Sequence, residues 1–286
     1  MDTQVERWFE AIGERRSRRS FRPDPVHTEL LDALQTHCDA YRPFADARVV
    51  LVREAPERLY RVSGADSALL PRSVTMVAGI MGAYGRVTGA PSALAIVGRK
   101  SPHVQEHAGY TGEAAVLEAA ALGLDTCWVG GFFSPSVTAG LVDLVGDELV
   151  LAVSPIGHAL TRHTRKERLV FRTGEQPKKR LRLEHIALGL IAKDWPGWAI
   201  AGVRAAQRAP SAVNRQPWRF RLHGDGVALA YHGADQGFIS KRLDCGIAML
   251  HFELGVLHSG RSGRWEPPGP GAGEADVACW RPGAPG

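Results

Sequence analysis

The stretch PSAVNRQPWRF, residues 210–220, combines two prolines, a hydroxyl, two amides and an indole in one short segment. Pro210 and Pro217 restrict the backbone at either end of it. Ser211 and Asn214 favour local turns over helix or strand pairing, and the alternating residues from Trp218 onward predict a strand. A rigid polar loop that leads into a strand can hold a flat heteroaromatic ligand by its edge, although an ordinary helix-to-strand connection has the same spacing.

The bulk composition is that of a folded protein with one large domain or two small ones. The chain has 286 residues, and its hydrophobic content of 44% is enough to build a core, which argues against global disorder. The net charge of +5 is mild, and the arginines occur in local clusters that suit phosphate groups as well as nucleic acid. The four cysteines are far apart and form no CxxC motif, so we expect reduced thiols in or near the core.

The sequence gives no sign of secretion, of membrane insertion or of nucleic-acid binding. Residues 1–6 include no basic stretch that leads into an apolar one, and no apolar run approaches the ~20 residues that span a bilayer. The arginine clusters lack interleaved aromatic residues or a known nucleic-acid-binding module. We therefore expect a cytoplasmic protein with neither a membrane nor a nucleic acid as its partner.

Hydrophobic periodicity and turn signals predict helices and strands along the whole chain. Helices are expected over residues 3–12, 28–41, 73–85, 111–122, 184–191, 198–207 and 244–258. Strands are expected over residues 48–52, 93–97, 149–153, 218–222 and 275–280, with a hairpin turn at residues 224–226 and another strand starting at Val227. The basic segment between Arg162 and Arg182 is typical of an exposed connection.

A candidate phosphate-binding segment is RRSRRSF, residues 15–21, at the end of the first expected helix. The guanidinium groups of Arg15, Arg16 and Arg19, with the hydroxyl of Ser17, are suitable donors because arginine binds phosphate oxygens with two hydrogen bonds. A solvated basic surface would show the same charge pattern.

A second candidate segment is CWVGG, residues 127–131, which follows an expected buried helix. Gly130 and Gly131 would let bare backbone approach a ligand closely, although glycine pairs are also common in plain turns. A third is the pair Lys166 and Arg168, after the sequence PIGH at residues 155–158. The chain has no GxGxxG, GxxxxGK[ST], GxSxG or HExxH motif, and its histidines lack metal-ligand spacing, so we expect no metal site.

Together these segments resemble elements of the nitroreductase superfamily, the FMN-dependent oxidoreductases. Residues 210–218 are similar to its PSAxNxQPW loop, and residues 15–21 are similar to its RRSxRxF element. The resemblance implies that the arginines and Ser17, with Lys166 and Arg168, bind the FMN phosphate and ribityl chain. It further implies that the Gly130 N–H donates to flavin N5 and that Gly131 follows it. Trp128 would lie beside the ring, and Pro210, Ser211 and Asn214 would lie at the ring edge.

The position of the PSAxNxQPW-like loop suggests a fused architecture. In the family this loop lies near the N-terminus and reaches the flavin of the partner subunit, whereas here it lies in the last third of the chain. The chain therefore resembles the tandem branch of the superfamily. That resemblance implies an α+β fold of two nitroreductase-like lobes, residues 1–172 and 184–286, joined by a linker at residues 173–183. Each lobe would have a mainly antiparallel sheet flanked by helices, and a monomer would act as a pseudo-dimer with one FMN site between its lobes.

The implied activity is reduction of a small-molecule electron acceptor, such as a nitroaromatic or quinone-like compound, with NAD(P)H as reductant. In that family the flavin carries the redox chemistry and the protein tunes it. An alternative is that the fusion has let the site decay, which would leave a non-catalytic flavin- or ligand-binding protein on the same fold.

Overall fold

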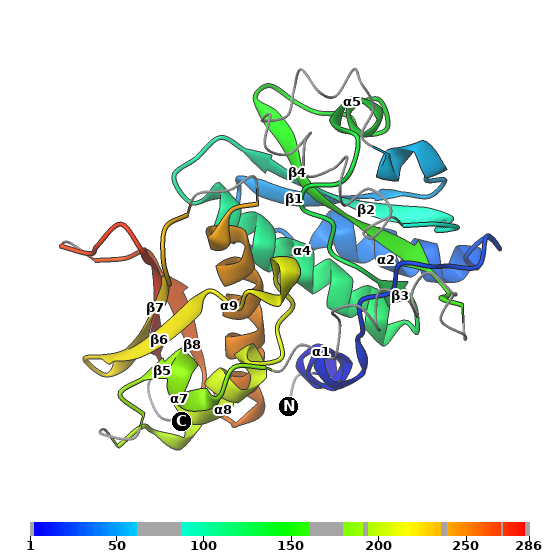
Figure 1. The fold of residues 1–286 in the computed structure, drawn as a ribbon. Coiled ribbons are helices and arrows are strands. Elements are labelled where there is room, and N and C mark those ends of the chain that lie inside the picture. Colours follow the sequence, from blue (N-terminus) through cyan, green and yellow to red (C-terminus); the bar gives the residue numbers. More distant parts are fainter. Residues whose placement is uncertain are drawn as a thin grey trace, which may run out of the picture. The chain divides into compact units, whose positions relative to one another are not determined.

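Two separate sheets, each covered by helices, divide the chain into two units (Figure 1). The structure is a computed structural model, and it describes residues 3–61, 87–160, 180–190, 194–235, 239–269 and 271–283. The N-terminal unit comprises Arg15–Lys179, and the C-terminal unit comprises Met1–Glu14 with Arg180–Gly286. The expectation of two α+β lobes, each with its own mainly antiparallel sheet, is confirmed.

The N-terminal unit contains α2 (Thr28–Ala40), β1 (Ala47–Val52), η1 (Glu57–Tyr60), β2 (Ser92–Arg99), α4 (Val104–Ala121), β3 (Asp125–Thr126), α5 (Pro135–Ala139) and β4 (Glu148–Gly157). Its strands pair antiparallel in the order β1-β2-β4-β3. Strand β2 is buried at all but its last residue, because both faces of the sheet are covered. Ile96 packs beside Gly112 of α4, whereas Val97 belongs to an apolar layer with Leu59 and Phe133.

The C-terminal unit contains α1 (Thr3–Glu14), α7 (Leu183–Ile186), β5 (Ala187–Leu188), α8 (Gly197–Ala206), η3 (Ala212–Asn214), β6 (Trp218–His223), β7 (Gly226–Tyr231), α9 (Lys241–His258), β8 (Gly263–Glu266) and β9 (Asp276–Pro282). Its strand order is β5-β6-β7-β9-β8, antiparallel except for β5 with β6. Phe252 of α9 stacks on Phe220 of the sheet at 5.1 Å between ring centroids. A Cβ on Gly255 would lie 2.6 Å from the Ala201 carbonyl oxygen, so glycine is what allows α9 to approach α8 this closely.

The two compact units differ from the expected lobes in the placement of two segments. Helix α1 packs with the C-terminal unit, because its apolar face, with Trp8 and Ile12 buried, lies against that unit's helices. Residues 180–183 are also part of that unit rather than of a linker. The Arg180 guanidinium donates to the Ala209 carbonyl at 2.7 Å, and the Leu181 N–H donates to Gln216 Oε1 at 2.9 Å. The local sequence of either segment carries few signals of the unit that it joins.

Most of the expected elements are confirmed, with two exceptions. The helix expected from residue 111 begins at Val104, and Thr111 is buried inside it instead of capping it. The helix expected over residues 184–191 is a single turn, α7, followed by strand β5. The expected helix over residues 73–85 lies outside the described residues. All four cysteines are free and buried, as expected. Among the helices of the described residues, none has the length and apolar character needed to cross a membrane.

Candidate functional site

The arginine-rich segment is held to the sheet of the N-terminal unit by its backbone. The Arg18 N–H donates to the Thr126 carbonyl at 2.9 Å, and the Phe21 N–H donates to the Thr88 carbonyl at 2.9 Å. Ser17 also forms a parallel bridge with Thr126. These contacts place the segment beside the start of the second candidate segment, CWVGG, so the structure brings the two together within one unit.

The arginines of this segment differ in their roles. The Arg18 guanidinium donates to the Leu160 carbonyl at 2.7 Å, which makes it a structural tie. Arg16 is exposed and donates to the Arg15 carbonyl at 2.9 Å, and Arg15 lies 3.4 Å from the hydroxyl of Ser17. Arg19 is half-buried, and its own carbonyl accepts the Thr88 N–H. Three guanidinium groups and a hydroxyl at one sheet edge are suitable donors for a phosphate group.

The CWVGG segment continues along β4. Val129 and Val153 exchange both of their backbone hydrogen bonds, at 2.8 and 3.0 Å. The Gly130 that follows is half-buried, and its N–H has no hydrogen-bond acceptor in the described part of the chain. An N–H that is partly withdrawn from water and has no acceptor fits a ligand with an acceptor atom at that position. Gly131 is buried immediately after it.

Trp128 is fixed on helix α4. Its indole N–H donates to the carboxylate of Glu113 at 2.5 Å, and Glu113 is fully buried. A Cβ on Gly112 would lie 2.6 Å from the indole ring, so the ring rests on bare backbone. Glu113 was missed in the sequence, where nothing distinguishes it from Glu106 and Glu118, the other two glutamates of α4.

The third candidate segment cannot be placed, because Lys166 and Arg168 lie outside the described residues. Strand β4 ends at Gly157, and the His158 carbonyl then accepts the Arg22 N–H at 2.8 Å.

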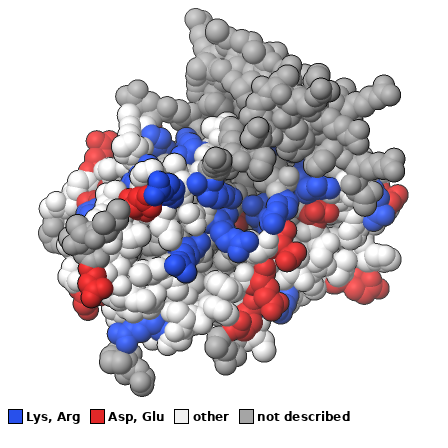
Figure 2. All heavy atoms as spheres, turned by 60° about the horizontal axis from the view of Figure 1, so that its bottom comes forward, with Lys and Arg blue, Asp and Glu red and all other residues white. Residues whose placement is uncertain are grey.

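Figure 2 shows Lys and Arg side chains on the same face as Asp and Glu side chains, so that face does not carry charge of a single sign.

The loop at residues 210–217 has an unusual backbone in the C-terminal unit. Val213, Asn214 and Gln216 have φ angles of 47°, 56° and 46°, in the left-handed region that side chains other than that of glycine rarely adopt. The energetic cost of this backbone conformation is highest for a β-branched residue such as Val213. Val213 is 68% exposed. Backbone strain of this kind persists only where the surroundings impose it, and it is concentrated at ligand-binding positions.

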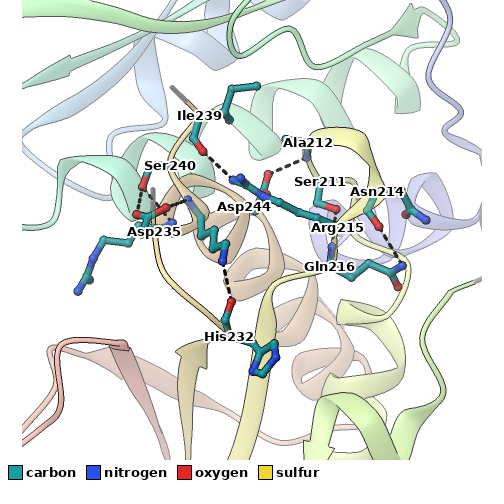
Figure 3. A network of polar contacts seen from close by, with 12 residues as sticks. Ser211, Ala212, Asn214, Arg215, Gln216, His232, Asp235, Ile239, Ser240 and Asp244 are labelled. Carbon is teal, nitrogen blue, oxygen red and sulfur yellow. Dashed lines mark hydrogen bonds and ion pairs between the residues drawn. The ribbon is translucent and has the colours of Figure 1, made fainter. Parts of the chain in front are cut away.

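Polar contacts with the first turn of α9 impose this conformation (Figure 3). Asp244 is buried, and its two carboxylate oxygens accept the Ala212 N–H at 3.0 Å and the Arg215 Nε–H at 2.6 Å. Arg215 also donates to the Ile239 carbonyl at 2.9 Å. Across the loop, the Ser211 hydroxyl oxygen accepts the Gln216 N–H at 2.9 Å. The loop is therefore tied to α9 at two points and closed on itself at a third.

These contacts define what the expected ring-edge residues can do. Because Ser211 already accepts one hydrogen bond, its O–H remains able to donate to a ligand oxygen. The Asn214 side-chain oxygen accepts from Arg180 at 3.1 Å, which orients the amide. Pro210 is buried and fixes the start of the loop. Ser211, Asn214 and Pro210 thus lie in one preformed loop.

Asp244 is the titratable group most strongly shifted by this arrangement. Burial raises the pKa of its carboxyl from 3.8 to about 6, although the charge of Arg215 and the Ala212 N–H act to lower it. Desolvation thus outweighs the ion pair. Asp244, Arg215, Gln216 and Arg180 were all missed as candidate residues. Arg215 and Gln216 lie inside the quoted stretch, and Asp244 is an acidic residue at the start of an apolar helix, which is a detectable signal.

The chain is similar over most of its length to a known family and to a solved structure. A family model described as "Putative TM nitroreductase" matches residues 7–256. The crystal structure of a putative nitroreductase from Thermotoga maritima is 19% identical, with a TM-score of 0.57, and the match covers 96% of this chain and 92% of that one. A search of curated proteins gave no significant match.

Two nitroreductase structures with bound FMN match a smaller share of the chain. A nitroreductase with bound FMN from Bacteroides fragilis is 17% identical, with a TM-score of 0.43, over 61% of this chain and 98% of that one. Another with bound FMN, from Desulfitobacterium hafniense, is 19% identical, with a TM-score of 0.45, over 55% of this chain and 91% of that one.

Proposed function

Because the chain belongs to the nitroreductase family whose model spans residues 7–256, we propose that it is an FMN-dependent oxidoreductase. Its electron acceptor would be a small molecule, such as a nitroaromatic or quinone-like compound, and its reductant would be NAD(P)H. The observation that carries the proposal is the joining of two segments in the N-terminal unit. The arginine cluster lies beside the segment that presents the Gly130 N–H, through the Ser17–Thr126 bridge.

The residues of the N-terminal unit fit the two polar ends of such a cofactor. Arg15, Arg16 and Arg19, with Ser17, would hold the phosphate, because guanidinium groups match phosphate oxygens with paired hydrogen bonds. The Gly130 N–H would donate to the ring atom at which negative charge develops, and a preorganised donor of this kind stabilises that charge without reorganisation. FMN, when bound, would supply the two-electron chemistry.

The loop of the C-terminal unit would contribute the edge contacts. Ser211 has an O–H to donate, and Asn214 has an oriented amide, both on a backbone held by Asp244. We propose that residues of both units serve one flavin and that the protein acts as a monomer. This part of the proposal rests on the family's use of the corresponding loop and on the distribution of the segments along the chain.

The direct test of the phosphate assignment is a double substitution, Arg16→Ala with Arg19→Ala, purified beside the unaltered protein. We expect loss of most of the bound flavin, measured from the visible absorbance of flavin released per chain. The matched control is Arg58→Ala with Arg99→Ala, which removes the same charge from exposed positions of the same unit.

The control should keep its flavin, since exposed charges outside the segment contribute little. Full retention of flavin by the Arg16/Arg19 variant would refute the phosphate assignment. Equal loss in both variants would show that overall charge, and not this segment, governs binding. Reduction of a nitroaromatic by the unaltered protein with NAD(P)H would then test the activity itself.

A further inference from the structure

A second feature of the C-terminal unit has the character of a binding site. Helices α1, α8 and α9 enclose a groove of about 320 Å³, which is at the lower end of the range for small-molecule sites. All of its lining residues belong to this one unit, and none is among the residues assigned above to the flavin.

The walls of the groove are apolar. Phe9 and Ile12 come from α1, and Ile200 and Ala201 come from α8. Phe9, Ile200 and Ala201 are only half-buried, so apolar surface remains open to solvent in the groove. His258 of α9 stacks on Phe9 with ring centroids 3.9 Å apart and an interplanar angle of 12°, which gives one wall a flat aromatic surface.

Two cationic residues also line the groove. Arg204 lies in the last turn of α8, and Arg208 lies two residues after the end of that helix. Both side chains are exposed, and both line the groove. In the described part of the chain, neither guanidinium has a carboxylate partner. Arg208 Nη2 lies 4.0 Å from the position of a Cβ on Gly13, so this guanidinium lies over the last turn of α1. The nearby acidic residue Glu6 is engaged with His258 Nδ1 at 3.1 Å and is not a lining residue.

We propose that this groove binds a small amphipathic carboxylate, with its apolar body against Phe9, Ile200 and Ala201 and its carboxylate at Arg204 and Arg208. Apolar walls alone would accept any hydrophobic molecule, and the two arginines select an anion by charge complementarity. The simpler role for the arginines is to complement the negative end of the α8 dipole. That role would affect the stability of the unit and leave ligand binding unchanged.

The test is calorimetric titration of the FMN-saturated full-length protein with decanoate and, separately, with 1-decanol. We expect saturable binding of decanoate that weakens as the ionic strength rises, because the arginines are exposed. Arg204→Ala with Arg208→Ala should weaken decanoate binding about tenfold, since two exposed ion pairs are removed, and should leave 1-decanol binding nearly unchanged.

Two further variants make the outcome specific. Arg264→Ala removes an exposed arginine elsewhere in the same unit and should leave decanoate binding unchanged. Ala201→Trp should fill the groove and abolish binding of both compounds. No decanoate binding, or binding that is insensitive to the Arg204/Arg208 substitutions, would overturn the proposal. Release of flavin in step with decanoate binding would also overturn it, because the decanoate would then be competing at the flavin site.

Discussion

Replacing Asp244 by Asn is expected to make the protein more stable at neutral pH, although it breaks a buried ion pair. Asn has nearly the shape of Asp, and its one side-chain oxygen can still accept the Ala212 N–H. Its NH2 group cannot accept the Arg215 Nε–H, so that charged hydrogen bond is lost. Breaking a buried pair by removing one partner usually costs about 3 to 5 kcal/mol. Here Arg215 keeps 24% of its side chain exposed and keeps its bond to the Ile239 carbonyl, so its charge is not stranded.

The magnitude follows from the pKa of Asp244, which burial raises from 3.8 to about 6. A pKa that is higher in the folded state means that the folded protein binds the proton more tightly than the unfolded chain. The resulting stability is therefore present below pH 3.8 and is lost as the pH rises through about 6. A shift of about two units corresponds to about 3 kcal/mol. The neutral Asn avoids this loss, so the stability gain should reach about 3 kcal/mol at pH 7 and fall below about 1 kcal/mol at pH 4.

Urea unfolding followed by tryptophan fluorescence suits this test, because every tryptophan except Trp128 lies in the C-terminal unit, to which Asp244 belongs. The control is Asp225→Asn, an exposed residue of the same unit, whose effect should stay within about 0.5 kcal/mol at both pH values. Lower stability of the Asp244→Asn variant at pH 7, or a gain that does not change with pH, would refute the reasoning that desolvation outweighs the ion pair. We also expect weaker flavin binding in this variant, because a tie that holds the strained loop is lost.

Three other substitutions test separate contacts. Glu148→Gln should lower the stability of the N-terminal unit by about 1 to 2 kcal/mol at pH 7, because Arg48 donates two hydrogen bonds to this carboxylate, at 2.9 and 2.7 Å. Arg48 lowers the pKa of Glu148 from 4.5 to about 2, so the stability that this pair contributes is fully present above pH 4.5. The stability difference between the variant and the unaltered protein should therefore shrink as the pH falls towards 2. A stability difference that does not change with pH would contradict the assignment. Gly112→Ala should displace the Trp128 ring and lower the stability of the N-terminal unit by about 1 to 3 kcal/mol through overpacking. The fluorescence of Trp128 should change as the ring moves. Unchanged fluorescence would show that the ring does not rest on Gly112. Val213→Gly should raise the unfolding free energy by up to about 1 kcal/mol by relieving the left-handed backbone, and a loss of stability would mean that the valine side chain makes a favourable contact.

The segments that could be recognised from the sequence were those with strong local patterns. Strand β2 is a continuous apolar run, and β6 alternates from Trp218, so both were predicted within two residues of their ends. The loop at residues 210–217 was recognised as rigid from its prolines and polar residues. Its positive φ angles were not, because Val213 has no intrinsic preference for that conformation and is held there by contacts with α9.

The features that were missed depend on contacts between residues far apart in the chain. Asp244 reaches Arg215 across 29 residues, and α1 packs on α9 across nearly the whole chain. Local spacing could indicate that α1 is amphipathic, but not which unit its apolar face joins. The start of α4 was missed because its first turn, after His103, lacks a strong cap, while Thr111 gave a misleading capping signal.

The most direct test of the central claim is the amount of FMN that the purified protein binds per chain, measured by visible absorbance before and after denaturation. The account predicts about one FMN per chain, with bleaching of the flavin band when NAD(P)H is added. About two FMN per chain would contradict the single site served by both units. No flavin, even after incubation with excess FMN, would contradict the proposed function and leave the fold with a decayed site.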